Sequence, residues 1–153
     1  MKYPLFVAIL LIALSASARD ETTEPSQPVV IENPTTVFSK AFWRRPHPED
    51  KIVHAERREW LDTSGKVTRW QWFLVIDLCP GTKAWLDTNP FLLTPTDGSE
   101  SQLLLSEAPE WFDLSDSPES QFQRASLSFS FMAGGNRLYA SDSGTGLNAE
   151  LKR

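Results

Sequence analysis

One cysteine and two histidines decide whether this sequence can support nucleophilic catalysis. Cys79 follows a predicted strand and precedes a predicted helix, a location that can lower the pKa of a thiol. A nucleophile also needs a base within hydrogen-bond reach. His54 is expected to pair with a residue that lies about six positions before Cys79 on the neighbouring strand, which places His54 about 20 Å from Cys79. His47 would reach Cys79 only if the pairing continued past two flanking prolines, so we predict a buried, inert cysteine and no catalytic residues.

The chain also lacks the ligand spacings of common metal sites. Two histidines and one cysteine do not form the paired patterns that bind zinc. The acidic stretch over residues 107–119 offers carboxylate oxygens, but it lacks the alternating aspartates of a calcium loop. Residues 142–145 (Asp-Ser-Gly-Thr) resemble the four-residue signature of aspartic proteases, without the apolar residue that should precede it. We read them as a turn after the last strand, and we predict no metal and no cofactor.

The six tryptophans are the unusual feature of the composition. Trp70, Trp72 and Trp85 lie in strongly apolar segments and are expected in the core. Trp43, Trp60 and Trp111 lie beside charged or loop residues. Exposed indole rings stack on sugars or on partner proteins, so these three are the candidate binding residues.

Length and charge limit the possible partners. The chain has 153 residues, which favours one domain, and its formal net charge of -5 disfavours nucleic acid as a partner. A single cysteine excludes an intrachain disulfide framework. With 41% hydrophobic residues, the chain has enough apolar material to build a core.

The first eighteen residues have the pattern of a removable export signal. Lys2 supplies the positive start, residues 4–14 are apolar, and Ala16 and Ala18 form a small-residue cleavage site before Arg19. As a helix, the apolar run would reach only about 16 Å, against a hydrocarbon layer of about 30 Å. We therefore expect export to the bacterial periplasm or the extracellular space, with no membrane span after cleavage.

Composition divides the rest of the chain into three parts. Residues 19–36 are acidic and proline-rich, and we predict a flexible leader there. Residues 37–141 form the predicted single globular domain, in which 37–43 is expected to be a short edge strand or a segment lying on the domain. Residues 142–153 are polar and are predicted to be a C-terminal tail.

Two β-hairpins are predicted, over 52–61 with 67–78 and over 122–132 with 137–141. In the second strand of the first hairpin, Trp70, Trp72, Leu74 and Ile76 lie on one face, and the residues between them form a face that is only partly apolar. This pattern predicts a strand that is fully covered on one face and partly covered on the other. A short helix is expected over 80–88. The predicted fold is therefore α+β: a small, mostly antiparallel sheet of four or five strands with one or two short helices on one face.

Two functions remain open at this stage. The first is a non-catalytic exported module that binds a protein or glycan of the cell envelope through exposed tryptophans or a sheet edge. The second is a small secreted hydrolase whose site is assembled from scattered His, Cys, Asp and Ser residues. A cleft that brings a histidine to Cys79 or to an aspartate would favour the hydrolase.

Overall fold

The computed structural model describes residues 27–97, 102–115, 118–132 and 135–146. The predicted signal, with Ala16, Ala18 and Arg19, lies outside the described residues, as does the chain after residue 146. Among the residues that are described, no helix has both the length and the apolar character needed to cross a membrane.

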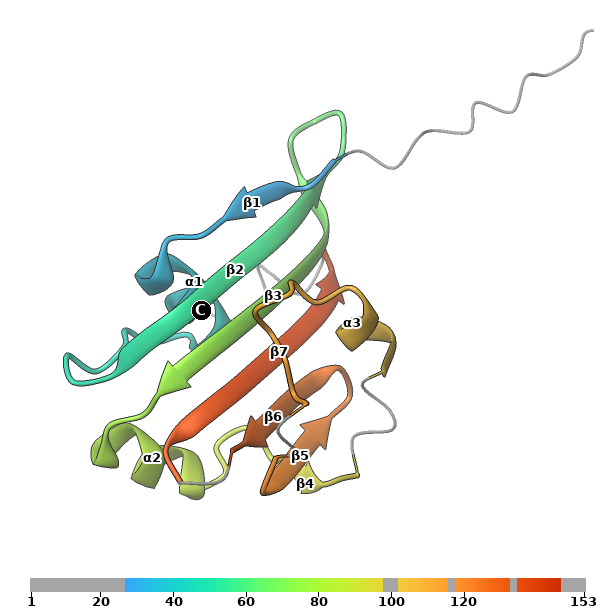
Figure 1. Cartoon of the computed structure of the whole chain (residues 1–153). Coiled ribbons are helices and arrows are strands. Elements are labelled where there is room, and N and C mark those ends of the chain that lie inside the picture. Colours follow the sequence, from blue (N-terminus) through green and yellow to red (C-terminus); the bar gives the residue numbers. More distant parts are fainter. Residues whose placement is uncertain (1–26, 98–101, 116–117, 133–134, 147–153) are drawn as a thin grey trace, which may run out of the picture.

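One antiparallel sheet dominates the structure (Figure 1). Its seven strands lie in the order β1-β2-β3-β7-β6-β5-β4. Their bounds are β1 Val29–Ile31, β2 Lys51–Leu61, β3 Val67–Asp77, β4 Thr94–Pro95, β5 Ser120–Arg124, β6 Leu127–Phe131 and β7 Arg137–Thr145. The predicted α+β class with a mostly antiparallel sheet is confirmed, but four or five strands were too few.

The described part of the chain has three short helices, and they lie on both faces of the sheet. They are α1 Pro34–Phe42, α2 Pro80–Asp87 and α3 Gln102–Ser106. Figure 1 shows α1 and α3 on opposite sides of the central strands. The prediction of helices on one face was therefore wrong, because it treated the second apolar face of β3 as only partly covered.

Helix α1 begins inside the segment predicted to be a flexible leader. The side chain of Asn33 accepts a hydrogen bond from the backbone N–H of Thr36 at 2.9 Å, and Pro34 occupies the first turn, where its missing N–H costs nothing. Its buried positions recur with helical spacing: Val37, Phe38, Ala41 and Phe42. The edge strand expected at 37–43 is thus a helix, since this cap and this spacing outweigh the strand propensity of the apolar residues.

Strand β1 extends the ordered structure further toward the N-terminus. Val29, Val30 and Ile31 pair with Glu59, Arg58 and Arg57 of β2. The predicted leader 19–36 is therefore wrong for the residues of β1 and for the start of α1. These residues gain backbone hydrogen bonds from β2, and composition alone could not anticipate that partner.

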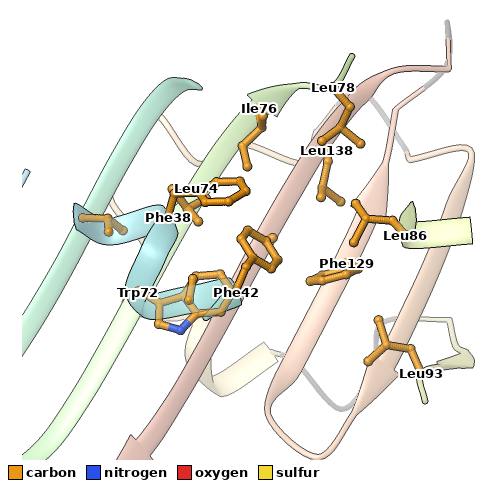
Figure 2. Packing of buried hydrophobic residues seen from close by; sticks show 13 residues of the cluster. Phe38, Phe42, Trp72, Leu74, Ile76, Leu78, Leu86, Leu93, Phe129 and Leu138 are labelled. Carbon is orange, nitrogen blue, oxygen red and sulfur yellow. The ribbon is translucent and has the colours of Figure 1, made fainter. Parts of the chain in front are cut away.

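The larger hydrophobic core lies between α1, α2 and the sheet. Phe42 lies 5.9 Å from both Trp72 and Phe129, measured between ring centroids. Figure 2 shows Phe38 and Phe42 of α1 facing the side chains of β3, with Leu86 of α2 and Leu93 closing the cluster beside Phe129. This core fixes α1 on the sheet.

A second, smaller core covers the other face of β3. Phe73 and Val75 pack there with Leu104 of α3 and Phe112. The residues Gln71 to Ile76 of β3 are consequently all buried. With residues 62–65 as the turn, the sequence predicts that Val53 and Ala55 face Leu74 and Trp72 on the core side. The structure pairs Ala55 with Leu74, a shift of two residues that keeps Ala55 on its predicted face, but a bulge between Ile52 and His54 turns Val53 into the smaller core.

The second predicted hairpin is a three-stranded arrangement. A turn at Ala125, whose φ is 50°, divides the predicted strand 122–132 into β5 and β6. Ser128 and Ser130 of β6 are buried. Strand β7 runs to Thr145, so residues 142–145, predicted as the start of a tail, lie in the sheet beside β3.

Gly144 allows a close approach between β7 and Trp70, and this predicts the effect of adding a methyl group. A Cβ at position 144 would lie 2.6 Å from Cζ2 of Trp70. We expect G144A to lower the free energy of unfolding by about 1–3 kcal/mol, measured by urea denaturation.

The matched control is G81A in α2, where the new Cβ would meet only Sγ of Cys79 at 3.8 Å. This substitution should be neutral or stabilising by up to about 1 kcal/mol, since alanine favours a helix. Equal effects of the two substitutions would contradict the close packing at Gly144.

Candidate functional site

A groove of about 550 Å³ lies between α1 and strands β2, β3 and β7. We call it the α1 groove. Trp70, Trp72 and Trp43 supply its aromatic lining, while four charged side chains supply its polar part: Lys40, Arg57, Glu59 and Asp142. An apolar hollow with a few converging polar groups is the common form of a small-ligand site.

Three of these charges form one network at the wall of the groove. Lys40 of α1 donates to Oε1 of Glu59 at 2.7 Å, and Nε of Arg57 donates to the same oxygen at 2.5 Å. Arg57 and Glu59 are both buried, at positions two residues apart on the same face of β2. Because α1 supplies one member of the network, the charges and the helix hold each other in place.

Glu59 is ionised in this setting. Burial acts to raise the pKa of Glu59, but the hydrogen bonds and positive charges of Lys40 and Arg57 outweigh it, so the net pKa lies below its ordinary value. The carboxylate is therefore a fixed acceptor, with two cations already committed to one of its oxygens.

Asp142 also lines the groove, and its pKa is shifted in the opposite direction to that of Glu59. Burial raises the pKa of Asp142 above its ordinary value, against hydrogen bonds from Ser126 and the backbone of Ser143 and the charge of Arg57. Ser126 Oγ donates to Oδ1 at 2.6 Å and Ser143 N donates at 2.8 Å. Its carboxyl group therefore titrates at a higher pH than an exposed aspartate, within a site that also holds an ionised glutamate.

Two of the three indoles that line the groove, those of Trp70 and Trp43, differ in their exposure. Trp70 lies under the guanidinium of Arg57, with 5.0 Å from Cζ to the ring centroid. Its Nε1 is buried and has no hydrogen-bond partner among the described residues. Trp43 stands at the end of α1 with φ 53° and is 78% exposed, so its ring faces solvent at the groove's rim.

The three predicted binding tryptophans do not form one surface. Trp43 lies on the α1 groove. Trp60 is half-buried beneath Arg69, 4.3 Å from Cζ to the ring centroid, and Trp111 is half-buried and stacked on His54 at 4.9 Å between ring centroids. Trp111 packs against the second core, on the face opposite α1. Only Trp43 is therefore placed beside a groove of the size described above.

The structure brings His47 close to Cys79, an arrangement that the flanking prolines were expected to prevent. The donor atoms of His47, Glu49 and Cys79 all lie within 4.8 Å of one another. Cys79 is buried, as predicted, and caps α2, since its Sγ accepts a hydrogen bond from Thr82 N at 3.4 Å. The sheet does not continue to His47; a turn before β2 places it there, with Asp50 N donating to His47 O at 3.0 Å.

A second hollow, of about 270 Å³, lies between the end of α2 and strands β5 and β6. Its lining is largely apolar and includes Leu86, Phe91, Phe122 and Phe131. It has few polar groups that could orient a ligand, so the α1 groove is the stronger candidate.

Sequence reasoning missed most of the polar residues of the α1 groove. Lys40, Arg57 and Glu59 were not identified as candidate residues. The available signal was charged residues at core-facing positions of β2, where a strand that only covered a core would carry apolar ones. Asp142 was assigned to a tail, so its placement beside β3 was also missed.

Comparison of the chain with family models, with curated proteins and with solved structures gave no match in any of the three cases. We therefore infer the function from the geometry of the α1 groove and from the residues that form it.

The pKa of Asp142 predicts a distinctive dependence of stability on pH. Because the folded state holds this proton to higher pH than the unfolded chain, Asp142 costs stability increasingly as the pH rises above the ordinary value of 3.8. We expect D142N, which keeps the acceptor for Ser126, to be more stable than the wild type at pH 7, with the difference shrinking toward pH 4. Urea denaturation at a series of pH values measures this.

Asp77 provides a control whose effect on stability should change with pH in the opposite direction. Its hydrogen bonds with Arg137, at 2.7 Å and 3.0 Å, lower the pKa of Asp77, so its stabilising contribution is present at neutral pH and is lost as the pH falls. D77N should therefore be less stable than the wild type at pH 7, and the two should converge in acid. A stability difference for D142N that does not change with pH would contradict the proposed burial of its charge.

Proposed function

We propose that this protein is an exported, non-catalytic binding module that holds a short neutral glycan segment of the cell envelope in the α1 groove. The observation that carries the proposal is the combination of indole surfaces with fixed, mutually paired charges in one groove. Sugars present apolar C–H faces that stack on indoles and hydroxyl groups that need oriented donors and acceptors.

The charges of the groove favour an uncharged ligand. Lys40 and Arg57 are matched by Glu59 and Asp142, so the groove presents no excess of either sign when all four are ionised. Charged partners fit surfaces of complementary sign, which this groove does not offer. Hydroxyl groups instead accept from guanidinium or ammonium groups and donate to carboxylates at the same time.

The position of Trp43 supports a role in contact with a partner. A large side chain with a left-handed backbone and 78% exposure gains little from the fold itself. The ring packs only loosely on Phe91, at 6.3 Å between centroids. Its exposed face at the rim is placed to stack on a ligand that occupies the groove.

A hydrolase is the alternative, and two observations favour it. The first is that His47 lies near Cys79, with ligand atoms within 4.8 Å of each other, although Cys79 is buried. The second concerns the α1 groove. Glu59 and Asp142 line the same groove with pKa values displaced in opposite directions, which is the relation between a catalytic base and acid. However, Glu59 is engaged by two cations, which weakens it as a base or nucleophile. The binding assay below also separates the two functions, because a hydrolase would release shorter products from the bound oligosaccharide.

Binding of oligosaccharides tests the proposed role of the α1 groove. We expect the protein to bind neutral β-linked oligosaccharides of glucose or N-acetylglucosamine. Isothermal titration calorimetry measures this binding. W43A should weaken this binding about tenfold or more, since truncation of an aromatic contact residue commonly costs over 1 kcal/mol.

The matched control is W111A, on the opposite face of the sheet, which should bind as the wild type does. An equal loss in both variants would indicate a general loss of structure. Binding that is unchanged in both W43A and D142N would place the ligand elsewhere, and failure of every neutral oligosaccharide to bind would refute the ligand class.

The start of the mature protein tests the proposed export. The mature protein should begin at Arg19 when the full chain is expressed in a bacterium, as read by N-terminal sequencing of the envelope and extracellular fractions. Replacing Ala18 with a bulky residue should block this cleavage. Recovery of a protein that still begins with Met1-Lys2 would contradict the proposed export.

A further inference from the structure

A second cluster of reactive groups lies at the other end of β2 from the charges of the α1 groove. His47 and Glu49 are exposed on the turn before β2, and Cys79 lies at the start of α2. Their donor atoms lie within 4.8 Å of one another, and His47 Nδ1 is 3.9 Å from Glu49 Oε2. We call these three residues the His47 cluster; none of them lines the α1 groove.

We propose that the His47 cluster binds a divalent transition-metal ion of the zinc type. Imidazole nitrogen, carboxylate oxygen and thiolate sulfur are the three protein ligands that zinc uses, and the mixed set disfavours calcium and magnesium, which take oxygen ligands. Bond lengths of about 2.0–2.3 Å place neighbouring tetrahedral ligands roughly 3.3–3.8 Å apart. The donors of the His47 cluster therefore need to close by about 1 Å, which the exposed side chains of His47 and Glu49 permit.

One carboxylate joins the two segments that carry the ligands. Asp50 Oδ1 accepts from Cys79 N at 2.9 Å, while Oδ2 accepts from His47 N at 3.0 Å and from Thr82 Oγ1 at 2.7 Å. The turn and the start of α2 are thus fixed relative to each other without using the donor atoms of the ligands. This is the role that residues around a metal site commonly have, since they orient the ligands before the ion arrives.

The binding step needs no redox partner. The Cys79 thiol loses its proton to water, a sulfur–metal bond forms, and the oxidation states of sulfur and metal do not change. The hydrogen bond from Thr82 N to Cys79 Sγ supports negative charge on the sulfur. Three protein ligands leave a fourth tetrahedral position for water.

The test uses the purified protein, freed of metal with a chelator and titrated with ZnCl₂ by calorimetry and with CoCl₂ by absorption. We expect one ion per chain, a sulfur-to-cobalt charge-transfer band, and a higher midpoint of thermal unfolding when zinc is present. C79S should abolish the band and weaken zinc at least about tenfold, and H47Q and E49Q should each weaken it.

C79S is informative because serine is itself a favoured N-cap, so α2 should remain folded. Equal thermal unfolding of the metal-free variants and wild type checks this. The matched control is H54Q, whose ring stacks on Trp111 outside the His47 cluster, and it should bind zinc normally. No binding at excess zinc, or zinc binding that C79S leaves unchanged, would overturn the proposal.

Discussion

The burial of β3 on both faces is the constraint on which the rest of the structure depends. Six consecutive residues from Gln71 to Ile76 are buried, so the strand needs hydrogen-bonded neighbours at both edges and a cover on both faces. β2 and β7 supply the edges. Helices α1 and α2 cover one face, while α3 and the segment around Phe112 cover the other. Burial of each large apolar side chain contributes roughly 1.5–3 kcal/mol, which is sufficient to hold short helices that would not form alone.

The α1 groove follows from the incomplete cover of this face. The apolar side chains of α1 meet Trp72 and Leu74, but β2 and β3 continue past the helix toward Glu59 and Trp70. At that end the sheet carries charged residues in place of apolar ones. Arg57 is tolerated there because Glu59 neutralises it, and Lys40 extends the pair onto the helix. A buried network of this kind adds little net stability but fixes geometry, which is what a binding site requires.

The sequence predicted the parts of the fold that depend on local alternation. Trp72, Leu74 and Ile76 lie on one face as expected, and the class of the fold is correct. The start of helix α1 was missed because residues 19–36 were assigned to a flexible leader on their acidic, proline-rich composition, although Asn33 and Pro34 form a typical helix start. The turn at Ala125 could not be predicted, since alanine rarely adopts a positive φ and the sheet imposes it.

The candidate sites show the same division. Exposure of Trp43 was predictable from its charged neighbours, but the pairing of Lys40 with Glu59 joins residues that come together only through α1. The proximity of His47 to Cys79 depends on a turn held by Asp50, and the sequence analysis instead considered a continued strand. Contacts between elements far apart in sequence were the ones that residue patterns did not determine.

The paired charges of the α1 groove and the His47 cluster lie at opposite ends of β2. Glu59 lies near one end of this strand and His47 precedes the other end, a separation of about 25 Å along an extended strand. A metal held by the His47 cluster would therefore lie far from Glu59, although Trp43 at the rim of the groove is only four residues before His47. At this separation the metal and Glu59 could not act together on one bond, which disfavours a metal-dependent hydrolase that uses both.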